Sequence, residues 1–214
     1  MTPKNGFAAE PAAVAGVVRY QVDPQRPWRQ GRYYMKSPRA GHLAEAVVAL
    51  RIGGNVPIDR NRQPRVLAMD QKDYHFTPET ITLQAGDSVK FTNHDTGIHN
   101  VHAFGTVADF NIMLAPGQEH IQPFPRAGGI RGPVKIDCVF HGEMRSWIFV
   151  FRHPYFAMTG EDGSFRLGGV PPGEYDLDVA HPAGRLRTSR KVTVRPGETS
   201  KVEILLSPDD LVSG

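Results

Sequence analysis

The sequence predicts an all-β protein made of two β-sandwiches, and three observations support this. The 214 residues include 22 glycines and 18 prolines, which interrupt the chain too often for long helices. Between them, apolar residues occur in short runs that alternate with polar residues, as in half-buried strands. The chain is also long enough for two small domains with separate cores.

Composition narrows the function classes. Charge is nearly balanced, with 25 Lys and Arg against 22 Asp and Glu, and no basic run could follow phosphates, so nucleic acid is not an expected partner. No apolar run reaches the roughly 18 residues of a membrane span. Residues 1–14 are expected to form a flexible tail, and Glu10 with two prolines interrupts any signal-peptide core. The single cysteine excludes an intramolecular disulfide and leaves a free thiol.

Two strands are predicted near the N-terminus, at residues 16–22 (GVVRYQV) and 43–50 (LAEAVVAL). The intervening segment 25–41 is too polar and too rich in turn-forming residues for a further strand. Residues 53–65 (GGNVPIDRNRQPR) show no periodicity and indicate a linker. A new unit therefore starts at residue 66.

Residues 66–152 predict about seven strands, enough for a small sandwich. Ile81 and Leu83 alternate with polar residues, as do Val89 and Phe91 after the turn AGD, and this pattern predicts a hairpin. Strand and turn patterns recur in LAPGQEHIQPF and VKIDCVF. The segment WIFVF is apolar on both faces, which is typical of a strand buried between two layers.

The last third of the chain predicts four more strands. Their alternating apolar residues are Phe165 and Leu167, then Tyr175, Leu177 and Val179, then Val192 and Val194, then Val202, Ile204 and Leu206. Four strands alone would leave one sheet face exposed, whereas the two N-terminal strands bring the count to six. We therefore expect a discontinuous domain of residues 15–52 and 153–208, with residues 66–152 inserted into it.

Three potential metal ligands, one of them the only cysteine, lie close together in the segment CVFHGEM (138–144). A tight loop can turn the Cys138 thiolate and the His141 imidazole toward one cation, and Met144 can approach from another side. Soft sulfur combined with nitrogen selects copper. Such a site needs a second histidine from elsewhere in the chain, and the candidates are His75, His94, His99, His102, His120 and His153.

Four stretches, in order, resemble the cupredoxins, the plastocyanin and amicyanin group of blue copper proteins: ITLQAGDSVKFTN, GIHN, LAPGQ and CVFHGEM. The short C-x-x-H-x-x-M loop is most similar to that of amicyanin. This resemblance covers residues 66–152 and implies a Greek-key β-sandwich with one type 1 copper site. It implies that His99, Cys138, His141 and Met144 are the metal ligands.

The resemblance also implies that Asn100 ties the two ligand loops together by hydrogen bonds. Many relatives carry Ser or Thr after the cysteine, and this hydroxyl meets the Asn. The present chain has Val139 there, so a bond from Asn100 must find backbone instead.

Each of these residues has an ordinary explanation when taken alone. A free cysteine packs as a small hydrophobe, Met144 would be a core residue and His141 a surface side chain. Their order, with a separate G-x-H-N upstream, favours the metal site. His94, His102 and His120 are interpreted as ordinary loop histidines, and His102 is the substitute if His99 is not a ligand.

The resemblance implies a one-electron carrier rather than an enzyme, because the ligand set leaves no open coordination position. His141 would be the exposed ligand, and Phe140, Met113, Leu114 and Pro116 would surround it where a redox protein docks. Two alternatives stay open, a copper transport or storage protein with the same ligands and a structural β-sandwich without metal. The family implies a periplasmic or extracytoplasmic location and specifies no oligomeric state.

The segment TGEDGSFRLGGVPPGEYDLDVAHP (159–182) resembles the carboxypeptidase regulatory-like domain, a transthyretin-like sandwich with D-G-x-F followed by G-x-P-P-G-x-Y. AGVVRYQV and AEAVVAL are similar to the first strands of that family, which supports the discontinuous domain. No catalytic residue is implied. Turn chemistry explains the motif residues, which are Asp162, Gly163, Pro171, Pro172 and Gly173.

Overall fold

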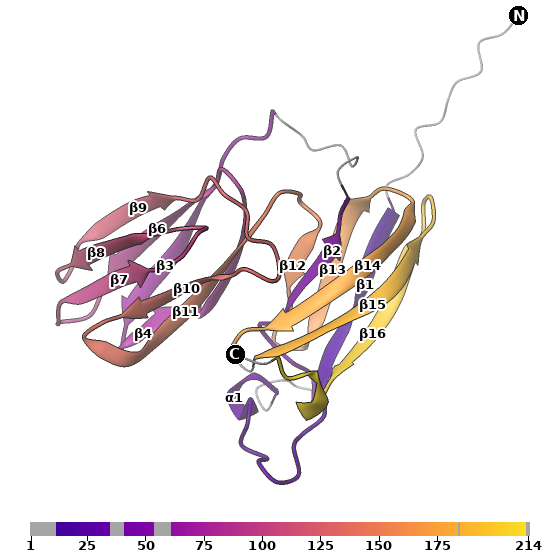
Figure 1. The fold of residues 1–214 in the computed structure, drawn as a ribbon, viewed down its shortest axis with the longest axis horizontal. Coiled ribbons are helices and arrows are strands. Elements are labelled where there is room, and N and C mark those ends of the chain that lie inside the picture. The colour runs from indigo at the N-terminus through magenta and orange to yellow at the C-terminus, as the bar shows by residue number, and fades with distance from the viewer. Residues whose placement is uncertain (1–11, 35–40, 54–60, 184, 213–214) are drawn as a thin grey trace, which may run out of the picture. The chain divides into compact units, whose positions relative to one another are not determined.

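The structure is a computed structural model that describes residues 12–34, 41–53, 61–183 and 185–212. Within these residues it consists of strands, one short α-helix, α1 (Gly31–Tyr34), and a 3₁₀ turn, η1 (Pro208–Asp210), so the all-β prediction is confirmed. The chain divides into two compact units, Met1–Val56 with Tyr155–Gly214, and Pro57–Pro154. We call these the outer unit and the inserted unit (Figure 1). No helix in the described part of the chain is long and apolar enough to cross a membrane.

The outer unit is a sandwich of a three-stranded and a four-stranded sheet, in the orders β13-β1-β16 and β12-β2-β14-β15. Strand β1 pairs antiparallel with β13 and parallel with β16, and β2 pairs antiparallel with β12 and β14. Both N-terminal strands thus lie between strands from the last third of the chain. The strands are β1 (Ala12–Tyr20), β2 (Val47–Arg51), β12 (Phe156–Met158), β13 (Ser164–Val170), β14 (Gly173–His181), β15 (Leu186–Val194) and β16 (Thr199–Leu206).

Two N-terminal predictions need correction. Strand β1 already begins at Ala12, and Ala12, Ala13 and Val14 are buried, so the predicted flexible tail is wrong for residues 12–14. Alanine has weak β-propensity, but Ala12 and Ala13 are buried where β1 pairs with β13 and β16. Residues 1–11 lie outside the described residues. Strand β2 begins at Val47 rather than at residue 43, because Glu45 has a φ of 57° that breaks the extended chain.

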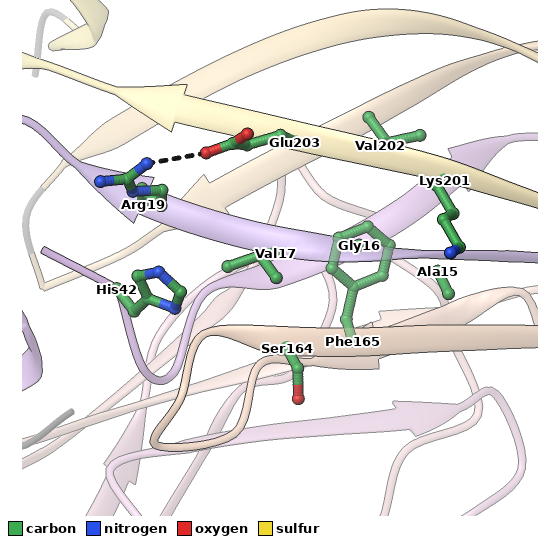
Figure 2. Close-up of a pocket in the computed structure, with 10 residues that line it drawn as sticks. All are labelled: Ala15, Gly16, Val17, Arg19, His42, Ser164, Phe165, Lys201, Val202 and Glu203. Atoms are coloured by element: carbon green, nitrogen blue, oxygen red, sulfur yellow. Dashed lines mark hydrogen bonds and ion pairs between the residues drawn. The ribbon is translucent and has the colours of Figure 1, made fainter. Parts of the chain in front are cut away.

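The glycines of the outer unit allow close approach between strands. A side chain at Gly16 would overlap the Val202 carbonyl oxygen, and Gly163 has a φ of 72° in the turn of the D-G-x-F motif. Figure 2 shows a pocket lined mainly by residues of β1, β13 and β16, which include the ion pair between Arg19 and Glu203 at 2.9 Å. The pocket therefore lies where the N-terminal strand β1 pairs with the C-terminal strands β13 and β16.

The inserted unit is also a two-layer sandwich, with sheets in the orders β5-β11-β10-β7-β8 and β4-β3-β6-β9 (Figure 1). Its core combines residues of both sheets, such as Met69 and Phe91 from one and Val101, Ile136 and Ile148 from the other. Nine strands are described where about seven were expected. They are β3 (Val66–Lys72), β4 (His75–Thr77), β5 (Thr80–Gln84), β6 (Ser88–Asn93), β7 (His99–Ala103), β8 (Phe110–Leu114), β9 (Glu119–Pro123), β10 (Val134–Cys138) and β11 (His141–Phe151).

The predicted hairpin across the AGD turn is wrong. Strand β5 pairs in parallel with β11, whereas β6 pairs with β3 and β9 in the other sheet. The alternation of apolar residues is real, but it points both strands into the shared core from opposite layers. The turn, with Gly86 at a φ of 98°, carries the chain from one sheet to the other.

Asp87 anchors this crossing. Its buried carboxylate accepts hydrogen bonds from the Arg62 guanidinium at 2.5 Å and from the backbone N–H groups of Arg65 and Gln84 at 2.8 and 3.0 Å. Burial disfavours the charged form, but these bonds outweigh that effect and hold the pKa of Asp87 below its ordinary value. The ionised carboxylate therefore stabilises the fold.

We expect Asp87→Asn to lower the free energy of unfolding by about 2–3 kcal/mol at neutral pH, because bonds to a buried charge are lost. A depressed folded-state pKa stabilises above the unfolded value of about 3.9, and this contribution disappears as pH falls through the folded pKa. The difference between wild type and variant should therefore shrink below about pH 4. Chemical unfolding at several pH values measures it. Glu119→Gln, which breaks an exposed pair with Lys90, should cost less than about 1 kcal/mol, and equal effects would contradict the prediction.

Candidate metal centre

The connection between β10 and β11 brings Cys138 and His141 together. Only Val139 and Phe140 separate them, and the two residues pair directly across the turn. Side chains of directly opposed residues lie on the same face of a hairpin. The Cys138 Sγ consequently lies 3.5 Å from the His141 Nδ1.

The pairing register of β10 and β11 shifts directly beyond Cys138 and His141. Asp137 faces Arg145 while Cys138 faces His141, so β11 carries additional residues between these pairs. Bulges of this kind change the direction of side chains and are common next to functional sites. Met144 lies within the bulge and is completely buried in the core that also contains Cys138.

His99 enters the same site from β7, the neighbour of β10. It begins the strand, and alternation places His99, Val101 and Ala103 on one face, where the last two join the core. His99 is fully buried. Its Nδ1 lies 3.1 Å from the His141 Nδ1 and 3.9 Å from the Cys138 Sγ.

His102, the sequence-based substitute for His99, does not reach this cluster. It occupies the opposite face of β7, and its Nδ1 lies 2.9 Å from the Asp137 carboxylate. The other candidate histidines have contacts of their own: His75 with the Asp73 carbonyl, His94 with Asp70, His120 with Gln122 and His153 with the ring of Phe151.

Asp95 sets the tautomer of His99. Its carboxylate lies 2.7 Å from the His99 Nε2 and also accepts the backbone N–H groups of Asp73 and Tyr74 at 2.7 and 3.0 Å. Burial opposes ionisation of Asp95, but the bonds from Tyr74, His99 and Asp73 prevail and keep its pKa below the ordinary value. An ionised carboxylate only accepts hydrogen bonds, so the His99 Nε2 is the donor of this bond, and the Nδ1 is the ring nitrogen that faces the cluster.

Asn100 connects the ligand-bearing segments through backbone and side chain. Its Oδ1 accepts a hydrogen bond from the Val139 N–H at 2.7 Å, and its Nδ2 donates to the Asn111 Oδ1 at 2.6 Å. The first bond is made with the backbone of Val139, the residue after Cys138, as expected because a valine side chain has no hydroxyl group. Asn100 thus fixes the turn between Cys138 and His141 against β7 and β8.

Exposed apolar side chains lie in the turn directly before the partly exposed His141 and on β8. Val139, Phe140 and Met113 are each more than half exposed. Leu114 was expected in this surface, but it is buried at 3% exposure, and that expectation is wrong. Leu114 pairs with His99 and shares its inward face, whereas Met113 pairs with Asn100 and faces outward.

The donor atoms suit a soft or borderline metal ion. The Nδ1 atoms of His99 and His141 and the Cys138 Sγ all lie within 4.8 Å of one another. A first-row ion such as zinc, bound by nitrogen at about 2.0 Å and sulfur at about 2.3 Å, separates its donors by roughly 3.3–3.7 Å. The observed separations of 3.1, 3.5 and 3.9 Å bracket this range. Two imidazoles with one thiolate fit copper or zinc.

Sequence reasoning missed two residues of this site, Asp95 and Tyr74. Tyr74 contacts both imidazoles edge-on, with ring centroids 5.4 Å from His99 and 4.9 Å from His141. Asp95 lies four residues before His99 in the sequence, a spacing that gives a weak signal. Tyr74 gives none, because only the β3–β4 connection brings it to the site.

Comparisons with known proteins give one family match and several similar solved structures. Residues 150–207 match the family model of the carboxypeptidase regulatory-like domain, which confirms that resemblance for the C-terminal part of the outer unit. No curated protein matches the chain. Similar solved structures include a purple cupredoxin from Nitrosopumilus maritimus, with 20% identity and a TM-score of 0.34 over 39% of this chain and 98% of that chain.

Two further solved structures are similar. Amicyanin from Paracoccus versutus has 22% identity and a TM-score of 0.35, covering 49% of this chain and 96% of that chain. A copper-containing nitrite reductase from Thermus scotoductus has 17% identity and a TM-score of 0.35, covering 48% of this chain and 25% of that chain.

We expect Asn100→Ala to lower the free energy of unfolding of the metal-free protein by about 2 kcal/mol, because it leaves the Val139 N–H without its acceptor. Asn111→Ala is the matched control. It removes only the bond to the Asn100 Nδ2 and should cost less than about 1 kcal/mol. Chemical unfolding measures both, and a larger effect of Asn111→Ala would refute the role given to Asn100.

Proposed function

We propose that the inserted unit binds one copper ion in a type 1 site and carries single electrons between redox partners. The observation that supports this most is the convergence of the His99 and His141 Nδ1 atoms on the Cys138 Sγ. Met144, buried in the same core, is the proposed axial ligand. Two His, one Cys and a weak axial Met is the ligand set of electron-transfer copper sites.

The protein's part in this function is to hold the donors still. Copper bound there supplies a one-electron couple between Cu(I) and Cu(II). Cys138 and His141 are fixed by a two-residue turn, and His99 by the Asp95 carboxylate at 2.7 Å. Because Cys138, His141 and His99 also stand on paired strands, the donors need little movement when the charge of the site changes.

The hydrogen-bond partners of a metal-binding histidine also influence the basicity of its imidazole. The carboxylate of Asp95 behind His99 resembles the carboxylate–histidine arrangement that fixes ring orientation at many metal sites. Asn100 acts as a positioning residue, through its bond to the Val139 N–H. These contacts favour one rigid arrangement over a site that opens to release its ion.

Electron exchange is proposed at His141, which is only partly buried. Val139 and Phe140 directly before it, and Met113 on β8, are each more than half exposed. We propose that these apolar side chains form the docking surface for a redox protein, because interface cores are depleted of charged residues. The proposed ligand set leaves no open coordination position for a substrate, so we propose a carrier rather than an enzyme. An extracytoplasmic location is proposed with it, on the family resemblance alone.

Copper loading tests the proposal. The protein should bind one equivalent of copper, and the oxidised form should show an intense visible band from charge transfer between thiolate and Cu(II). We expect Cys138→Ser and His99→Ala to lose this band. His102→Ala is the matched control, because His102 lies on the opposite face of β7 and pairs with Asp137, and it should keep the band unchanged. A colourless protein, or a band that survives Cys138→Ser, would reject the type 1 site.

Exchange with a chelator separates an electron carrier from a copper transport or storage protein. The buried positions of Cys138 and His99, at 2% and 0% exposure, favour slow release. Copper should therefore remain bound while the protein is reduced and reoxidised reversibly. Rapid and complete transfer of copper to a mild chelator would favour the transport or storage alternative.

A further inference from the structure

Tyr74 lies against both imidazoles of the candidate site. Its ring meets that of His141 at 82° and that of His99 at 89°, and the two histidine rings meet each other at 68° with centroids 4.8 Å apart. The three rings therefore contact one another edge to face, a favourable aromatic arrangement. His99 is fully buried, whereas Tyr74 is 52% exposed, so Tyr74 is the outermost of the three.

The Tyr74 ring extends from the β3–β4 turn toward the loop that precedes His99. It starts from the tip of the β3–β4 hairpin, where Lys72 pairs with His75 and leaves Asp73 and Tyr74 as a two-residue turn. Its hydroxyl lies 4.0 Å from the position that a side chain at Gly97 would occupy. Gly97 belongs to the loop between Asp95 and His99, and the ring therefore lies over this loop.

The backbone at Tyr74 is in a conformation that tyrosine rarely adopts. Asp73 and Tyr74 have φ values of 52° and 60°, the left-handed geometry of tight hairpins, where Asn and Gly are the usual residues. Such strained positions persist when the surrounding structure holds them, and they concentrate at functional sites. Here the Asp95 carboxylate holds both backbone N–H groups and the His99 Nε2 at once.

We propose that Tyr74 is a cover over the metal centre, clamped by Asp95, which keeps small anions and thiol reagents away from Cys138 and its two histidines. For the metal-bound state this rests on the proposed function. For the free thiol it does not. Tyr74 acts here as a positioning and shielding residue, and its contribution comes from the ring rather than from the hydroxyl group.

Two substitutions separate the cover from a structural role. Tyr74→Phe keeps the ring and should preserve shielding. Tyr74→Gly removes the ring and places at this position the residue that adopts positive φ most easily, so the backbone turn is retained. Phe104→Ala is the matched control, because Phe104 is an 82% exposed aromatic residue just after the other end of β7.

The decisive measurement is the rate at which Ellman's reagent modifies Cys138, the only cysteine, in the folded, metal-free protein. We expect Tyr74→Gly to react at least about ten-fold faster than wild type, as burial of the thiol is lost, with a nearly unchanged midpoint of chemical unfolding. Tyr74→Phe and Phe104→Ala should react within about two-fold of wild type. An unchanged rate in Tyr74→Gly, or equal acceleration in Phe104→Ala, would overturn the proposal.

Azide titration extends the test to the copper-loaded protein. The visible spectrum of wild type should not respond to azide, whereas that of Tyr74→Gly should shift as the anion reaches the metal. If wild type binds no copper, the proposed function fails while the thiol measurement still decides the cover. If copper binds and Tyr74→Gly remains insensitive to azide, the cover does not protect the metal, and the proposed function stands.

Discussion

The geometry of the candidate centre depends on one short constraint, the two-residue turn between Cys138 and His141. Direct pairing of these residues puts sulfur and nitrogen on the same face of the hairpin. A strand pair of this kind leaves little freedom for the two side chains. Everything else at the centre, the arrival of His99 on β7, the bond from Asn100 and the bulge that contains Met144, is arranged around this fixed pair.

The Cys138–His141 pair could be predicted from its spacing and His99 from the family resemblance, whereas Asp95 and Tyr74 could not be predicted. Cys138 and His141 are three residues apart, and the resemblance pointed to His99, which lies next to them in the structure. Asp95 and Tyr74 escaped prediction because their roles depend on where the β3–β4 turn lies in space. Met144 as a ligand remains a prediction, since burial alone does not distinguish a ligand from a core residue.

The fold shows the same division. Alternation of apolar residues identified β5 and β6 as strands, because it reports which face is buried. It did not identify their partners, since strands in opposite layers of a sandwich carry the same pattern as neighbours in a hairpin. The short strand β12 has a single aromatic residue, Phe156, and the start of β1 has a single β-branched residue, Val14, among alanines, so neither gave more than a weak strand signal.

The pairing of β1 and β2 has a consequence for biosynthesis. Among the described residues, the strands that hydrogen-bond along them, β12, β13, β14 and β16, all follow the inserted unit in the chain. As the polypeptide leaves the ribosome, β1 and β2 must wait unpaired while residues 57–154, which are contiguous, can already collapse. The order of translation thus favours folding of the inserted unit first, and until then the nascent chain carries two unpaired strands whose open edges a chaperone would be suited to protect.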